Sequence, residues 1–108
     1  MSLYEKYLEY TAAADAEKVS SLFAEDGLFY DEGPKKAGGE PVTVTGRVAV
    51  KAFFQQVFAN RGPIKAFNVS INGNAMRYDV RFGDLLVLAL GVMTEENGLI
   101  KEYRVTVI

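Results

Sequence analysis

The chain has 108 residues, of which 49% are hydrophobic and 24% are charged, and its formal net charge is −2. This composition is ordinary for a globular domain with one hydrophobic core, so we expect a single domain over residues 1–108. The small negative charge argues against a surface for nucleic acid or for anionic membranes.

Cysteine and histidine are both absent from the sequence. Disulfides, thiol nucleophiles, Ser-His-Asp triads and histidine-based zinc sites are therefore excluded. The acidic residues do not have a metal-ligand spacing and the glycines lack a phosphate-binding pattern, so we expect neither a metal nor a cofactor. Any acid–base chemistry must be done by Asp, Glu, Tyr or Lys.

Nothing in the sequence predicts a membrane segment. The longest hydrophobic run, Leu85–Met93, has nine residues, whereas a membrane-spanning helix needs about 20. The N-terminal segment "MSLYEKYLEY" carries acidic residues and no signal-peptide core. A cytoplasmic protein is the resulting expectation.

The first half of the chain predicts three helices. Hydrophobic residues recur at helical spacing over 3–14, 16–24 and 47–60. Asp15 is the expected N-cap of the second helix, and Gly62 ends the third.

The remaining segments of the chain are predicted to form mainly strands. A short strand is expected in "GLFYDE", followed by a Gly- and Pro-rich loop over Glu32–Pro41 and a short extended piece in "VTVT". From residue 64 onward the period changes to two, which predicts a four-stranded antiparallel meander. Its strands are expected at "AFNVSIN", "AMRYDVRF", Leu85–Met93 and Leu99–Ile108. The fold class is therefore α+β, with helices covering one face of a sheet.

Two of these strands raise questions of burial. In "AFNVSIN", alternation places Phe67, Val69 and Ile71 on one face. Leu85–Met93 is hydrophobic on both faces, so a second cover is needed beyond the helices. A homodimer packed sheet to sheet would supply it; alternatively, the twist of the sheet covers the outer side.

The stretch "SLFAEDGLFYDEG" ends a hydrophobic strand on two carboxylates, Asp31 and Glu32. Asp31 could cap a turn, since Asp is favoured there for its local hydrogen bonds. It could equally be a base at the rim of an apolar chamber, where desolvation would raise its pKa. Glu32 is expected to be a solvated loop charge.

With "TGRVAVKAFF" as the third helix, this motif and the order of elements resemble the NTF2-like superfamily, in its ketosteroid isomerase and SnoaL-like branch. The resemblance covers nearly the whole chain. It implies a cone in which three N-terminal helices pack on a curved mixed or antiparallel sheet and enclose an apolar pocket.

The resemblance also implies site residues. Counted from Phe23, the family's Asp base falls on Asp31 and its Tyr hydrogen-bond donor falls on Tyr7. The family's second donor, a protonated Asp, falls at or near Leu90, where this chain has no carboxylate; Tyr103 is the suggested substitute. The loop over 32–41 is also longer than in the isomerase pattern.

The expected function is binding of a small hydrophobic, carbonyl-bearing molecule, with cofactor-free proton transfer of the isomerase, cyclase or lyase type. Because the second acid is missing, steroid isomerisation itself is not predicted. The alternatives are a non-catalytic ligand-binding or protein-docking module and a purely structural dimer. The expected pocket walls are Phe29, Phe53, Phe54, Phe67, Val69, Val80, Phe82, Leu90 and Tyr103.

Overall fold

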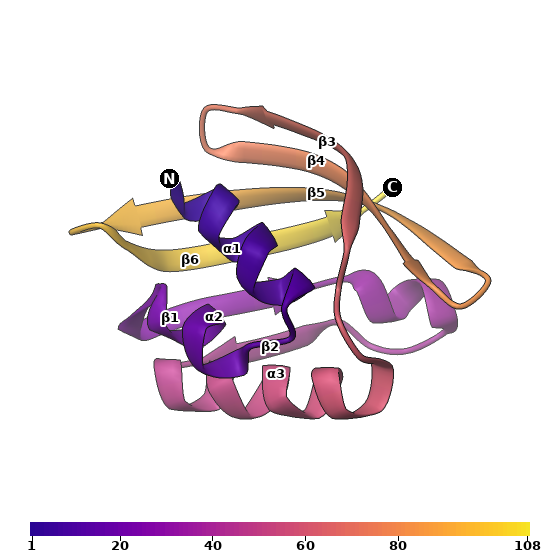
Figure 1. Ribbon diagram of the computed structural model, residues 1–108, viewed down its shortest axis with the longest axis horizontal. Coiled ribbons are helices and arrows are strands. Elements are labelled where there is room, and N and C mark those ends of the chain that lie inside the picture. Colours follow the sequence, from indigo (N-terminus) through magenta and orange to yellow (C-terminus); the bar gives the residue numbers. More distant parts are fainter.

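The computed structural model describes every residue from Met1 to Ile108 and confirms the α+β prediction (Figure 1). Its helices are α1 (Leu3–Ala12), α2 (Ala16–Ser21), the 3₁₀ helix η1 (Gly33–Ala37) and α3 (Arg47–Arg61). Its strands are β1 (Phe23–Asp31), β2 (Val42–Thr45), β3 (Ala66–Asn72), β4 (Ala75–Phe82), β5 (Leu85–Glu96) and β6 (Leu99–Val107). None of the helices has the length and hydropathy needed to cross a bilayer.

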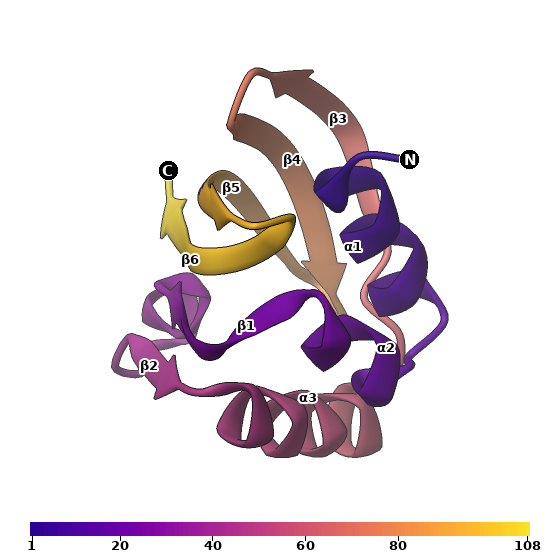
Figure 2. The same ribbon diagram turned by 90° about the vertical axis from the view of Figure 1, so that its left-hand side faces the viewer.

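The six strands form one mixed sheet in the order β2-β1-β6-β5-β4-β3. All neighbours are antiparallel except β1 and β6, which run parallel. In Figure 2, β3 and β4 curve over the helical side of the sheet, with α1 beside them and α3 beneath β1. The helices and the curved sheet thus surround a common interior.

The ends of α1 and α2 follow from local hydrogen bonds. Ser2 and Glu5 form a capping box at the start of α1. The side chain of Asp15 accepts a hydrogen bond from the backbone N–H of Lys18, which confirms its predicted N-cap role. The predicted second helix ran to residue 24, but α2 ends at Ser21. Pairing with β6 begins there, since the N–H of Ile100 donates to the carbonyl of Leu22 at 2.8 Å.

A bulge in β3 overturns the predicted single face for the hydrophobic residues of "AFNVSIN". Asn68 has a positive φ of 52°, and the register shifts beside it. As a result, Phe67 pairs with Asp79 whereas Ile71 pairs with Met76, so the two lie on opposite faces. The Asn68 side chain donates to the Asp79 carboxylate at 2.9 Å, which stabilises the bulge.

Tyrosine and phenylalanine rings join the helices to the inner face of the sheet. The ring of Tyr103, fully buried on β6, lies edge-on to Tyr7 and Tyr4 of α1, with centroids 5.1 and 5.9 Å apart. Phe29 of β1 lies 5.2 Å from Phe54 of α3. Contacts of this kind add to the free energy gained by burial, so both helices are held firmly on the sheet.

The outer side of β5 has no cover. Leu86, Leu90 and Val92 are 42%, 38% and 38% exposed, and with Leu88 they form a hydrophobic row that we call the outer face. Alternate residues of the same strand, such as Val87, are buried. The strand is therefore hydrophobic on both sides as predicted, but the sheet's curvature does not bury its outer residues.

Candidate functional site

A cavity of about 390 Å³ lies between α1, α3 and the inner face of the sheet. Seventeen of its 23 lining residues are hydrophobic, so the interior is apolar. The helices contribute Tyr7, Leu8, Thr11, Gly33, Pro34, Ala37, Phe53, Phe54, Val57 and Arg61. The strands contribute Phe29, Asp31, Val42, Ala66, Tyr78, Val80, Phe82, Leu85, Val87, Ala89 and Val105.

Asp31 and Arg61 are the only charged residues that line this cavity. The Arg61 guanidinium lies over the ring of Phe82, 5.3 Å from its centroid, and makes no ion pair. Nowhere in the chain do three acidic side chains gather as a metal site would require. The chemistry that the cavity can support therefore depends on one carboxylate, one guanidinium and the hydroxyl groups.

Asp31 is both a turn-capping residue and a cavity residue, so the two readings of its sequence position are compatible. Its carboxylate accepts a hydrogen bond from the backbone N–H of Gly33 at 2.8 Å. Burial raises the pKa of Asp31; the Gly33 hydrogen bond opposes this rise, and the charge of Glu32 adds to it. A raised pKa makes a carboxylate a stronger base toward a bound molecule.

Glu32 differs from the solvated loop charge that was expected. Its carboxylate accepts a hydrogen bond from the Tyr30 hydroxyl at 2.7 Å and forms an ion pair with Lys35 at 3.4 Å. It also accepts from the backbone N–H of Val107 at 3.4 Å. These contacts tie the start of η1 to the end of β6, so Glu32 fixes the chain segment that follows Asp31.

Tyr7 lines the same cavity as Asp31. Its side chain is 6% exposed and packs edge-on against Tyr103 and Phe54. Burial raises the pKa of Tyr7 well above its ordinary value, with further increases from Tyr78 and from the Asp31 carboxylate. The Tyr7 hydroxyl makes no hydrogen bond to another protein group, and it is not sealed off from the cavity. It is therefore free to donate to a bound molecule.

Of the expected wall residues, Phe29, Phe53, Phe54, Val80 and Phe82 all line the cavity. They come from β1, α3 and β4. The sequence found them because they follow a regular helical or alternating period, which the structure keeps in these elements.

Four expected wall residues lie elsewhere. The bulge at Asn68 breaks the alternation of β3, and both Phe67 and Val69 are exposed, at 39% and 40%. Leu90 pairs with Arg77 and Thr106 on the outer side of the sheet. Tyr103 points inward, but it is completely buried behind the cavity wall.

Tyr78 is the cavity residue that was not expected to act there. It faces inward from β4, where it pairs with Ala89. Burial raises the pKa of Tyr78; the nearby Tyr103 hydroxyl lowers it, and the Asp31 carboxylate raises it further. Alternation gives the face of a residue but not the position of a hydroxyl at the end of a long side chain, so the sequence offered no signal for it.

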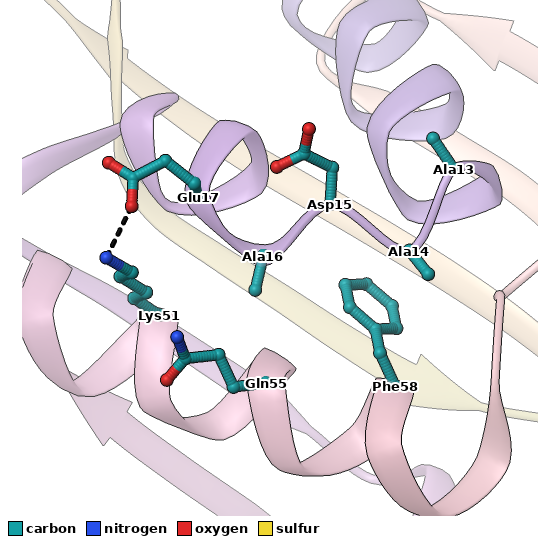
Figure 3. A pocket seen from close by; sticks show the side chains of 8 residues that line it. All are labelled: Ala13, Ala14, Asp15, Ala16, Glu17, Lys51, Gln55 and Phe58. Atoms are coloured by element: carbon teal, nitrogen blue, oxygen red, sulfur yellow. Dashed lines mark ion pairs between the residues drawn. The ribbon is translucent and has the colours of Figure 1, made fainter.

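A second hollow lies between the α1–α2 junction and α3 (Figure 3). Its volume is about 490 Å³, but it is wide open to solvent. Figure 3 shows Glu17 paired with Lys51 across it, with Phe58 on the far side. A hollow this open, with a solvated ion pair, does not exclude water from a ligand. We therefore assign the candidate site to the apolar cavity between the helices and the sheet.

No protein-family model matches the sequence, and no curated protein matches it either. Solved structures do match. A hypothetical protein with a ketosteroid isomerase-like fold from Catenulispora acidiphila, crystallised with trimethylamine, superposes with a TM-score of 0.73 at 13% identity, covering 96% of this chain and 83% of that one.

Two further structures point the same way. A proposed polyketide cyclase from Sinorhizobium meliloti gives a TM-score of 0.71 at 17% identity, covering 96% of this chain and 93% of that one. An NTF2-like protein of unknown function from Cytophaga hutchinsonii gives 0.70 at 14% identity, covering 98% and 87%. The chain therefore has the NTF2-like, ketosteroid isomerase-like fold, as its sequence predicted. At these identities the likeness concerns the fold alone.

Proposed function

We propose that this protein binds a small hydrophobic carbonyl compound in the cavity and catalyses cofactor-free proton transfer. In this proposal Asp31 is the base and Tyr7 donates a hydrogen bond to the carbonyl oxygen. The observation that carries it is a partly buried carboxylate with a raised pKa in the same apolar cavity as an unengaged tyrosine hydroxyl. The low-identity likenesses to the Catenulispora protein with a ketosteroid isomerase-like fold and to the proposed polyketide cyclase are consistent with it.

The proton balance of such a reaction is simple. The Asp31 carboxylate takes a proton from the carbon beside the carbonyl, and the C–H electron pair moves toward the oxygen to form an enolate. The hydrogen bond from Tyr7 strengthens as that oxygen gains negative charge. The protonated Asp31 then returns the proton to another carbon, or to the same carbon after a rearrangement. The apolar walls keep water away from both steps.

Binding of planar phenols tests this proposal, because a phenolate mimics the enolate in shape and charge. We expect wild-type protein to bind phenols and Tyr7→Phe to weaken binding by roughly tenfold or more, the typical effect of a hydrogen bond to a charged oxygen. Asp31→Asn should tighten binding, because it removes a negative charge close to the phenolate. If no phenol binds, or if binding ignores both substitutions, the proposed reaction is wrong.

A second candidate function is favoured by one feature of the same cavity. The Asp31 carboxylate has no cationic partner and lies in a cavity walled by rings such as Phe29, Phe53 and Tyr78. Aromatic walls with a carboxylate suit a small amine cation. The protein could then be a non-catalytic module for such amines, a class that includes the trimethylamine found with the Catenulispora protein.

The two candidates predict opposite effects of one substitution. Asp31→Asn should tighten the binding of phenols but abolish the binding of trimethylammonium or similar cations, since it removes their counter-ion. Calorimetric titration of wild type and Asp31→Asn with both ligand classes therefore decides between them. Tyr7→Phe should weaken the binding of phenols and have little effect on the binding of amines.

We also propose that two copies of the chain pair through the outer face. The row of Leu86, Leu88, Leu90 and Val92 is hydrophobic, uncovered and continuous along β5. Burying it against a second copy would remove this surface from water. On the flanking strands Arg81 pairs with Leu86 and Arg104 pairs with Val92, while Glu102 lies on the same face opposite Thr94. Charges of both signs therefore border the row and can pair across a two-fold axis.

A further inference from the structure

The hydroxyl groups that line the cavity differ in whether they are free to act. Three lining residues carry one: Tyr7, Thr11 and Tyr78. The hydroxyl of Thr11 is already engaged, because it donates to the backbone carbonyl of Tyr7 at 2.8 Å. Only Tyr7 and Tyr78 therefore have hydroxyls that a ligand could use.

Tyr78 can reach the cavity because the residue opposite it on β5 is small. It is 7% exposed on the inner side of β4, and its cross-strand partner on β5 is Ala89, whose side chain is a single methyl group. Directly paired residues share a face, with their Cβ atoms about 5 Å apart. The small Ala89 leaves room into which the tyrosine ring extends, while β5 itself offers no polar side chain there.

Tyr7 and Tyr78 face the same cavity from α1 and β4. Burial raises the pKa of Tyr7 most, and the nearby Tyr78 raises it further. The Asp31 carboxylate, which lines the same cavity, raises the pKa of both tyrosines. Behind them, the buried Tyr103 hydroxyl lies close to Tyr78 without the geometry of a hydrogen bond.

Other tyrosines of this region cannot take the same part. The Tyr4 hydroxyl donates to the carbonyls of Asn74 and Gly91, at 2.7 and 3.0 Å. The Tyr103 hydroxyl is sealed from the cavity by its complete burial. Among the tyrosine hydroxyls, Tyr78 is therefore the second donor available to a molecule that already contacts Tyr7.

We propose that Tyr78 donates a second hydrogen bond to the same ligand oxygen as Tyr7, so that the enolate is held between two tyrosine hydroxyls. This inference rests on the proposed proton-transfer function and adds a catalytic residue to it. It implies a ligand whose oxygen can accept two hydrogen bonds at once, as a ketone oxygen can with its two lone pairs.

The test is a double-substitution cycle with a nitrophenol, whose absorbance reports both binding and ionisation. We expect Tyr78→Phe to weaken nitrophenolate binding by roughly tenfold or more and to lower the ionised fraction of the bound phenol. The same loss should occur in the Tyr7→Phe background, because each donor bonds the ligand directly. Tyr10→Phe, a half-buried tyrosine of α1 outside the cavity, is the matched control and should bind like wild type.

Two outcomes would overturn the inference without touching the proposed function. Tyr7→Phe could weaken binding while Tyr78→Phe does not. Alternatively, Tyr78→Phe could weaken binding only when Tyr7 is present, which would mean that Tyr78 positions Tyr7 and does not itself bond the ligand. If neither substitution changes binding, both proposals fail. Thermal unfolding of each variant checks that the lost hydroxyl, and not a lost fold, causes the effect.

Discussion

The Asp31 carboxylate and Gly33 are in close contact, with a hydrogen bond of 2.8 Å from the Gly33 N–H to Oδ1. A Cβ atom added at Gly33 would lie 3.1 Å from the same Oδ1, tighter than ordinary contact. Gly33 therefore acts in two ways: its N–H orients the carboxylate, and its missing side chain lets the carboxylate lie against the backbone.

Asp31→Asn should raise the free energy of unfolding at neutral pH. A carboxyl whose pKa is higher in the folded state binds protons more tightly there, so stability falls as pH rises through the interval between the unfolded and folded pKa. Asparagine removes this cost and keeps an oxygen for the Gly33 N–H. Urea unfolding over a pH series should show the gain above the folded pKa, shrinking to nothing as pH falls below the ordinary Asp value.

Asp26→Asn is the matched control for this pH dependence. Its hydrogen bond with Lys101, together with that residue's charge, lowers the pKa of Asp26, so its contribution has the opposite sign. That stability is present above the unfolded pKa and is lost as pH falls through the folded pKa. The control should therefore gain nothing at neutral pH. An equal gain in both variants would mean that net charge, not the burial of Asp31, causes the effect.

Gly33→Ala should raise the pKa of Asp31 further while leaving the fold intact. The added methyl pushes the carboxylate away from the Gly33 N–H, and this hydrogen bond is what opposes the effect of burial. Carbon-detected NMR titration of the Asp31 carboxyl measures the change. Pro34→Ala, which alters the next residue of the turn, should leave the titration unchanged; a similar shift there would point to a general rearrangement of η1.

Gly91→Ala should destabilise the protein by about 1–3 kcal/mol, the usual cost of overpacking a core. An added Cβ would clash with the hydroxyl and ring of Tyr103, which is fully buried and cannot move aside. Denaturant unfolding measures the loss. Tyr103→Phe removes the nearest atom, so part of the loss should be recovered in the double variant. Equal costs in both backgrounds would show that this contact is not the cause.

Leu90→Glu should convert a dimer into a monomer without unfolding the chain. Leu90 lies in the middle of the outer face and is already 38% exposed, so a charge there costs little in one copy but is buried in a pair. Sedimentation velocity of wild type and variant measures the change. Val48→Glu is the control, because Val48 is 85% exposed on α3, away from the outer face. A monomeric wild type would refute the pairing.

The sequence predicted well wherever a regular period controls the structure. The hydrophobic stripes of α1 and α3 and the alternation of β4 gave the elements and most cavity walls, such as Phe54 and Val80. The family resemblance, counted from Phe23, also pointed to Asp31 and Tyr7, and both line one cavity although α1 is shorter and β1 longer than expected. Their roles remain proposals.

The sequence failed where long-range contacts override local pattern. The positive φ of Asn68 and its bond to Asp79 turn Phe67 to the other face, and a period of two cannot anticipate that bulge. Leu90 and Ala89 are neighbours on β5 and therefore face opposite sides of the sheet. A one-residue uncertainty in the alignment was enough to assign Leu90 to the inner side, although it lies on the outer side. Pairing with β6, not helix propensity, ends α2 before Phe23.

The parallel pairing of β1 with β6 also constrains how the chain reaches its fold. Phe29 of β1 pairs with Tyr103 of β6. Because β6 is the last strand in the sequence, β1 can join β5, β4 and β3 only after β6 has been synthesised. Until then, β2–β1 and β5–β4–β3 are two separate pieces of sheet. Contacts between residues so distant in sequence form slowly during folding. A ribosome-bound chain lacking Leu99–Val107 should therefore expose hydrophobic strand edges, and during synthesis the protein should depend on chaperones most at that stage.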